Sequence, residues 1–197
     1  MADAEFDRLH RLRTAPNFLT LLRICLAPLL VSVILDHRYG LAFALFVVAG
    51  LTDALDGAMA RLLHQRTMLG QYLDPVADKL LLSTLFLVLT HMGLIPLNIT
   101  VLVFSRDVSI LVVSAILFAA TGRREFRPSL LGKANTLTQI STVAVVLLYQ
   151  IYKAPWVAQA RQVTLWATMG ITIASGLHYA WVVVRKNANP ANGHTTH

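Results

Sequence analysis

The chain has 197 residues, of which 56% are hydrophobic and only 14% are charged. Soluble domains carry about 25% charged residues, so the composition excludes an ordinary water-soluble enzyme and indicates one compact membrane bundle. The net charge of +7 does not indicate a nucleic-acid partner, because the basic residues stand between apolar segments rather than in one run with aromatic residues. Anionic lipid head groups are the expected partner, and the single cysteine, Cys25, excludes an intramolecular disulfide.

Six apolar segments follow one another along the chain, separated by polar stretches. A membrane crossing needs about 20 predominantly apolar residues in a helix, so the pattern predicts an all-α integral membrane bundle of six transmembrane helices. Residues 1–16 form a polar arm, the membrane domain covers 17–186, and 187–197 form a tail that we expect to be disordered. The expected helices occupy residues 17–35, 41–60, 74–89, 99–120, 136–151 and 163–184.

Basic residues are unevenly distributed between the two sides of this bundle. With six crossings, twelve of the 17 lysines and arginines lie on one side, and only Arg38, Lys153 and Arg161 lie on the other. Cytoplasmic segments carry such an excess. We therefore expect both termini on the cytoplasmic side.

Two pairs of aspartates lie between the second and third apolar segments. Asp53 and Asp56 are three residues apart, and Asp74 and Asp78 are four apart, so each pair presents two carboxylates on one helix face. Carboxylate oxygens are the ligands of hard cations such as Mg²⁺ and Mn²⁺. Acidic residues at membrane depth are energetically costly, and their presence there therefore indicates a function. Alternatively, such pairs lie on helix faces exposed to solvent. As a further alternative, Asp74 serves only as an N-cap, with Pro75 as the first helical residue, but capping does not explain Asp78.

The complete spacing of this stretch is more specific than the acid pairs alone. The pattern D-x-x-D-G-x-x-A-R-x8-G-x3-D-x3-D, from Asp53 to Asp78, resembles the signature of the CDP-alcohol phosphatidyltransferases. The resemblance implies an enzyme that uses CDP-diacylglycerol as phosphatidyl donor, releases CMP and depends on two Mg²⁺ or Mn²⁺ ions. It also implies a homodimer in the bacterial cytoplasmic membrane, with the active site facing the cytoplasm.

The resemblance also assigns roles to individual residues. It makes Asp53, Asp56, Asp74 and Asp78 the metal ligands and Asp78 the general base that takes the proton of the acceptor hydroxyl. The residues that it places near the nucleotide and the donor phosphates are Asn17, Thr20, Gly57, Ala60, Arg61 and Gly70. Capping and ordinary helix packing are the alternative roles of Asn17 and Thr20.

The acceptor is indicated by a second stretch. Gly132–Gln139, GKANTLTQ, resembles the fifth helix of the branch that makes phosphatidylglycerol phosphate and cardiolipin, which implies that Lys133, Arg127 and Arg106 bind an acceptor phosphate. Glycerol 3-phosphate, which gives phosphatidylglycerol phosphate, is the first expectation. Phosphatidylglycerol, the acceptor of cardiolipin synthases, is the alternative, because Ser105-Arg106-Asp107 departs from the Gly-Arg-Glu of many phosphatidylglycerol phosphate synthases; inositol phosphate is third.

Some of these residues also have structural interpretations. Arg106 and Asp107 can neutralise each other inside a span, and the basic cluster that contains Arg127 can be a cytoplasmic flank. A transporter could use the same intramembrane acids as an ion path, but the repeated halves of such proteins are not evident in the sequence. A non-catalytic membrane scaffold would need none of the acids.

Overall fold

The computed structural model describes residues 15–62, 68–121 and 130–188, with side chains described for 25–52, 79–110, 112, 130–179 and 181. Each of these three ranges is built from α-helices and short turns. The helices are α2 Ala15–Leu35, α3 Tyr39–Leu62, α4 Met68–His91, α5 Leu97–Thr121, α6 Leu130–Ile151 and α7 Pro155–Ala188. For the described part of the chain, the prediction of an all-α fold with six helices is confirmed.

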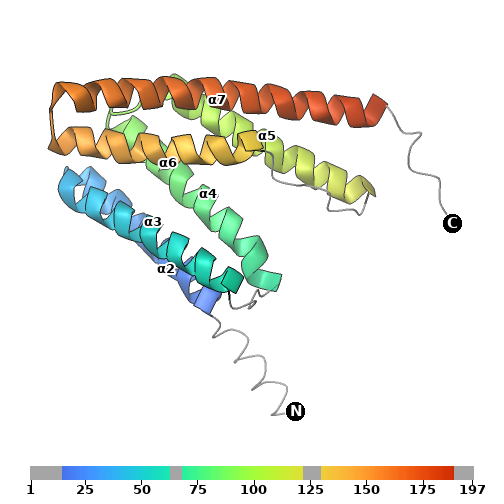
Figure 1. The fold of residues 1–197 in the computed structure, drawn as a ribbon, viewed down its shortest axis with the longest axis horizontal. Coiled ribbons are helices and arrows are strands. Elements are labelled where there is room, and N and C mark those ends of the chain that lie inside the picture. The colour runs from blue at the N-terminus through green and yellow to red at the C-terminus, as the bar shows by residue number, and fades with distance from the viewer. Residues whose placement is uncertain (1–14, 63–67, 122–129, 189–197) are drawn as a thin grey trace, which may run out of the picture.

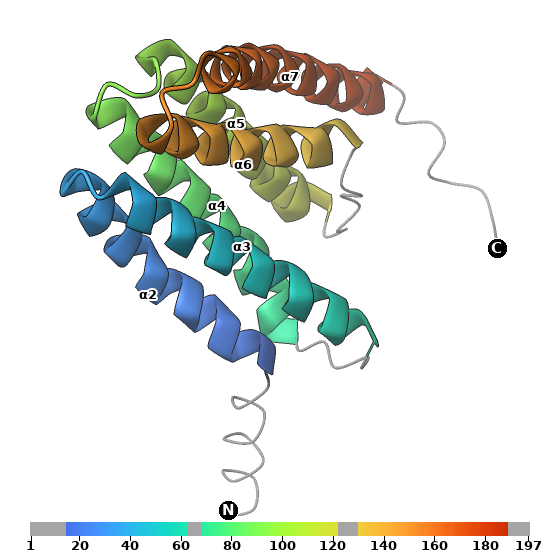
Figure 2. The same ribbon diagram turned by 60° about the vertical axis from the view of Figure 1, so that its left-hand side comes forward.

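The helices run alternately in opposite directions, so the short turns at 36–38, 92–96 and 152–154 gather at one end of the bundle, here called the turn end (Figures 1 and 2). α2 packs on α3 and on α4. α6 packs on α3 and on α7, and α5 packs on α7. The pair α2–α3 lies close to the pair α6–α7 at the turn end and diverges from it toward the opposite end (Figure 1). We call that opposite end the splayed end.

The turns end their helices through specific backbone conformations. After α4, the Leu94 amide donates a hydrogen bond to the Leu89 carbonyl at 2.8 Å, and Gly93 between them has a φ of 69°, as in a Schellman motif. His37 has a similar role after α2, with a φ of 57°. Residues other than glycine rarely adopt this left-handed backbone conformation. The His37 Nδ1 atom lies 3.0 Å from the Tyr39 hydroxyl. These turns fix where the chain reverses direction.

Two helices begin well before the residue that hydropathy predicts. α4 begins at Met68, so the prediction that Asp74 and Pro75 start this helix is wrong. α6 begins at Leu130 rather than at 136. The predicted starts mark where the apolar residues begin, whereas a helix is held by backbone hydrogen bonds and accepts polar side chains in its first turns.

α7 also begins earlier than predicted, and the cause is a proline. The apolar segment predicts a helix that begins at residue 163, but the helix starts at Pro155. Proline fixes φ near the helical value and lacks the amide hydrogen that would have no partner at a helix start. The Val157 and Ala158 amides both lie 3.1 Å from the Ala154 carbonyl, which makes Ala154 the residue that begins the hydrogen-bond pattern.

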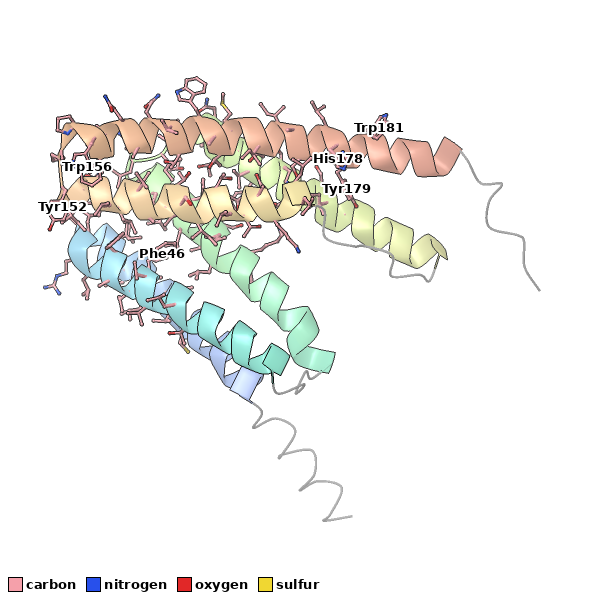
Figure 3. All side chains as sticks on the ribbon, in the orientation of Figure 1. Phe46, Tyr152, Trp156, His178, Tyr179 and Trp181 are labelled. Carbon is pink, nitrogen blue, oxygen red and sulfur yellow. The ribbon has the colours of Figure 1, made fainter. Side chains whose placement is uncertain are left out.

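The buried apolar side chains of the described residues form one cluster. They come from the end of α2, the start of α3, the second half of α4, the start of α5, the second half of α6 and the first half of α7. Phe46, labelled on α3 in Figure 3, belongs to this cluster. The cluster members that are almost inaccessible to solvent include Leu30, Ile34, Leu85, Phe86, Leu89, Val103, Val143, Val146 and Leu147.

The outer surface of the bundle is also rich in large apolar side chains. Exposed examples are Leu41, Val48 and Leu51 on α3, Val101, Val108 and Val112 on α5, and Val163, Trp166 and Leu177 on α7. Among the described residues, α6 is the one helix that is long and apolar enough to cross a membrane by length and composition, and the apolar stretches 25–35, 39–52 and 79–91 are shorter. Membrane crossing by all six helices and cytoplasmic termini therefore stay predictions.

Candidate functional site

The two aspartate pairs lie on consecutive helices at matching distances from the connection between them. Asp56 and Asp53 are six and nine residues before the last residue of α3, and Asp74 and Asp78 are six and ten residues after the first residue of α4. At 1.5 Å of rise per residue, both pairs lie about 9–15 Å from the helix ends that the connection joins. The backbone thus brings four carboxylate-bearing positions to one level of the bundle, which fits a site for divalent cations.

The residues predicted to bind the donor lie on the same helices, near the splayed end. Asn17 and Thr20 lie in the first two turns of α2, which begins near the end of α3 and the start of α4 (Figure 2). Gly57, Ala60 and Arg61 lie near the end of α3, and Gly70 lies near the start of α4. The side chains of all these residues and of the four aspartates are outside the described part, as is Arg127 entirely, so their roles stay predictions.

An ion cluster follows Asp78 directly in the chain. Lys79 on α4 and Arg106 on α5 both contact Asp107 Oδ1 at 2.7 Å, and Arg106 also donates a hydrogen bond to the Ser175 hydroxyl on α7 at 2.7 Å. Asp107 and Arg106 are nearly buried, with 10% and 9% of their side chains exposed, whereas 36% of Lys79 is exposed. The cluster ties three helices together beside the aspartate site and keeps one positive charge in excess.

A seam of polar side chains runs between α6 and α7. Near its middle, the Thr142 hydroxyl lies 2.8 Å from the Thr168 hydroxyl and 3.1 Å from the Thr164 carbonyl. Thr142 and Thr168 are completely buried, and these hydrogen bonds satisfy their hydroxyl groups. In this part of the seam, the polar side chains hold α6 and α7 together.

Closer to the splayed end, the same seam contains donors without partners. Asn135 and Gln139 are 1% and 3% exposed, and the Thr172 hydroxyl donates to Asn135 Oδ1 at 2.7 Å. Within the described part of the chain, however, Asn135 Nδ2, Gln139 Nε2 and Arg106 Nε are buried and have no hydrogen-bond partner. A buried polar group without a partner costs ~1–3 kcal/mol. Arg161 Nε, near the turn end, is a fourth buried donor without a partner among the described residues. A ligand is one of the partners that can satisfy such groups.

The predicted acceptor residues have different surroundings. Lys133 lies on the first turn of α6 and is exposed, while Arg106 is engaged by Asp107 and Ser175. Asn135 and Gln139 lie in the stretch Gly132–Gln139 that indicates the acceptor, but within this stretch the sequence assigns a role only to Lys133. Two amides one helical turn apart at the start of an apolar segment could have indicated them, since such side chains need partners when buried.

The fold and the aspartate positions define a class of protein: a helical bundle that carries paired carboxylates on two successive helices. The family pattern described as CDP-alcohol phosphatidyltransferase matches residues 13–174. The chain belongs to this family, and the resemblance in the sequence is confirmed.

Relatives with two different activities are similar to the chain. The cardiolipin synthase (CMP-forming) of Rattus norvegicus is 32% identical over 91% of this chain and 64% of its own length, and that of Homo sapiens is 36% identical over 71% and 52%. The CDP-diacylglycerol--glycerol-3-phosphate 3-phosphatidyltransferase of Bacillus subtilis is 31% identical over 83% of this chain and 92% of its own length. The chain thus spans between about half and two thirds of the mammalian relatives, and the family is common to both activities.

Proposed function

We propose that the protein transfers a phosphatidyl group from CDP-diacylglycerol to phosphatidylglycerol and releases CMP. The observation that carries the transfer reaction is the complete aspartate pattern, with both pairs at one level of α3 and α4 in a chain of this family. In the reaction, an acceptor hydroxyl oxygen forms a bond to the phosphorus that carries diacylglycerol. The bond from that phosphorus to CMP breaks, and CMP leaves with the electron pair.

The protein's own groups account for the proton and the charge in this reaction. Asp78 takes the proton from the acceptor hydroxyl, and Arg61 supplies a cation for the donor phosphates. The four aspartates would hold two divalent ions, Mg²⁺ or Mn²⁺, which when bound provide positive charge against the pyrophosphate. Gly57 and Ala60 leave space on α3 for the nucleotide.

Phosphatidylglycerol is preferred as acceptor because of charge. Asp107 partly neutralises Arg106 and Lys79, and the buried polar residues in the first half of α6 are the neutral amides Asn135 and Gln139. This environment suits the single negative charge of a phosphodiester. The mammalian relatives named cardiolipin synthase are consistent with this choice.

Glycerol 3-phosphate is the second candidate acceptor. It is supported by the exposed lysine at position 133 and by the Bacillus subtilis relative, of which the chain covers 92%. Glycerol 3-phosphate carries more negative charge than a phosphodiester, so this alternative depends on Lys133 reaching the phosphate.

We further propose that all six helices cross a cytoplasmic membrane, as a homodimer, with the splayed end at the cytoplasm. The helices have 21 to 34 residues, so each is at least about 30 Å long, the thickness of the hydrocarbon core. Exposed Tyr152 and Trp156 lie at the turn end and exposed Trp181 lies toward the splayed end (Figure 3). Aromatic residues concentrate at the two interfaces of a membrane.

The test measures CMP release by the purified protein in detergent with CDP-diacylglycerol and Mg²⁺ or Mn²⁺, with phosphatidylglycerol and glycerol 3-phosphate in separate tubes. We expect release with phosphatidylglycerol. Because a general base contributes ~10²–10⁴ in rate, Asp78→Asn should lower release at least about 100-fold, while Asp36→Asn, an exposed acid, should not.

Each alternative has its own result in this assay. Release with glycerol 3-phosphate alone would replace phosphatidylglycerol by the second candidate. A folded, metal-supplied protein that releases no CMP with phosphatidylglycerol, glycerol 3-phosphate or inositol phosphate would contradict the transferase and favour the transporter or scaffold.

A further inference from the structure

We propose that Asn135 and Gln139 on α6, together with Arg106 Nε on α5, form a donor set that binds the phosphoglycerol group of the acceptor. This inference rests on the proposed function and identifies the part of the acceptor that the site recognises. Asn135 and Gln139 are then specificity residues that contact the substrate.

Two of the three groups, Asn135 and Arg106, contact one stretch of α7. Asn135 accepts a hydrogen bond from Thr172, and Arg106 donates one to Ser175, both at 2.7 Å. Thr172 and Ser175 are three residues apart in α7 and therefore on the same helix face. Gln139 lies one turn further along α6 than Asn135 and is equally buried. Two helices thus present donors toward the same part of a third.

The chemistry of the unsatisfied atoms defines the ligand. Within the described residues, Asn135 Nδ2, Gln139 Nε2 and Arg106 Nε are all N–H donors without a partner. A ligand that satisfies them must supply acceptor oxygens, as a phosphate and glycerol hydroxyls do. The hydroxyl pair of Thr142 and Thr168, further along the seam, is already satisfied and needs no ligand.

The charge around the donors limits which phosphate fits best. Lys79 and Arg106 carry two positive charges and Asp107 one negative charge, so the ion cluster has an excess of one. The two amides add hydrogen bonds without adding charge. A phosphodiester has one negative charge, whereas a phosphate monoester has about −1.5 to −2 at neutral pH. The donor set therefore matches the phosphoglycerol of a phospholipid better than free glycerol 3-phosphate.

The main test is Gln139→Met, which keeps the length of the side chain but removes the donor. We expect the KM for phosphatidylglycerol to rise at least ten-fold and the KM for CDP-diacylglycerol to stay within two-fold of wild type. Because the substitution removes a buried donor without a partner, the melting temperature without substrate should stay the same or rise. Asn135→Asp, which keeps the oxygen bonded by Thr172 but removes the NH₂ group and adds a negative charge, should raise the same KM.

The matched control is Thr142→Val, on the same helix and equally buried. It should lower the melting temperature but leave the acceptor KM unchanged. If Gln139→Met instead behaves like Thr142→Val, with a lower melting temperature and an unchanged KM, the donors are structural and the inference is wrong. If the KM for glycerol 3-phosphate rises and the KM for phosphatidylglycerol does not, the donor set still binds a phosphoglycerol group, but that of soluble glycerol 3-phosphate.

A binding measurement separates this inference from the proposed reaction. Native mass spectrometry counts the lipids that the protein retains after incubation with phosphatidylglycerol or phosphatidylcholine. We expect wild type to prefer phosphatidylglycerol and Gln139→Met to lose that preference. If wild type released no CMP but showed the preference and the variant lost it, the reaction would be wrong and the binding site supported. Equal retention by wild type and variant would overturn the inference.

Discussion

The ion cluster of Lys79, Arg106 and Asp107 makes a quantitative prediction about stability. Asp107→Asn keeps the shape of the side chain but removes the charge that compensates two cations at 2.7 Å. Removal of one partner of a buried ion pair costs ~3–5 kcal/mol. Because Lys79 is 36% exposed and can be hydrated, and because asparagine still accepts a hydrogen bond, we expect the lower limit, about 3 kcal/mol.

This loss is measurable as a lower melting temperature. For a chain of this size, 1 kcal/mol corresponds to about 2–4 °C, so Asp107→Asn should unfold about 6–12 °C below wild type. Tryptophan fluorescence during heating in detergent measures the shift. Asp36→Asn, which removes an exposed acid at the turn end, is the control and should change the melting temperature by less than about 2 °C. An equal shift in both variants would refute the stabilising role of the cluster.

Three further predictions concern the metal ions and the turn end. Chelation with EDTA should abolish CMP release and Mn²⁺ or Mg²⁺ should restore it; full activity in EDTA would exclude the proposed ions. Gly93→Ala should lower stability by about 1 kcal/mol because φ at this residue is 69°, whereas Gly40→Ala, with open space around the added methyl group, should not; equal melting temperatures would contradict the strain. Arg161→Met should cost about 1–2 kcal/mol, since it loses a 2.7 Å hydrogen bond to the Leu94 carbonyl, and Arg38→Met, at an exposed position, should cost less; the reverse order of melting temperatures would argue against this contact.

The sequence predicts the number of helices and the placement of the two aspartate pairs on consecutive helices, because both depend on patterns along the chain. Apolar segments separated by polar stretches identify the helices, and the aspartate pattern identifies the family without any tertiary information. Boundaries are less predictable. Apolar content does not reveal that Pro155 starts a helix or that α4 begins at Met68, because backbone hydrogen bonds determine helix ends.

The surroundings of the site depend on contacts between distant parts of the chain. Ser175 lies 69 residues from Arg106, and Thr172 lies 37 residues from Asn135, so no local pattern predicts these pairs. The sequence predicts that Arg106 and Asp107 can neutralise each other, and the structure confirms this contact. It does not predict the participation of Lys79, because that contact depends on how α4 and α5 pack.

Along α6, the buried residues of the first half are the amides Asn135 and Gln139, whereas those of the second half are Thr142, Val143, Val146 and Leu147. Substitutions in the second half therefore alter contacts that hold the helices together, whereas substitutions near Lys133 or Asn135 alter polar groups outside those contacts. With the acceptor site that we propose, a lineage can exchange one acceptor alcohol for another by replacing a few side chains of α6 while the helices keep their arrangement. Such exchanges would produce relatives that have similar sequences but are named for different activities, as the mammalian and Bacillus subtilis relatives are.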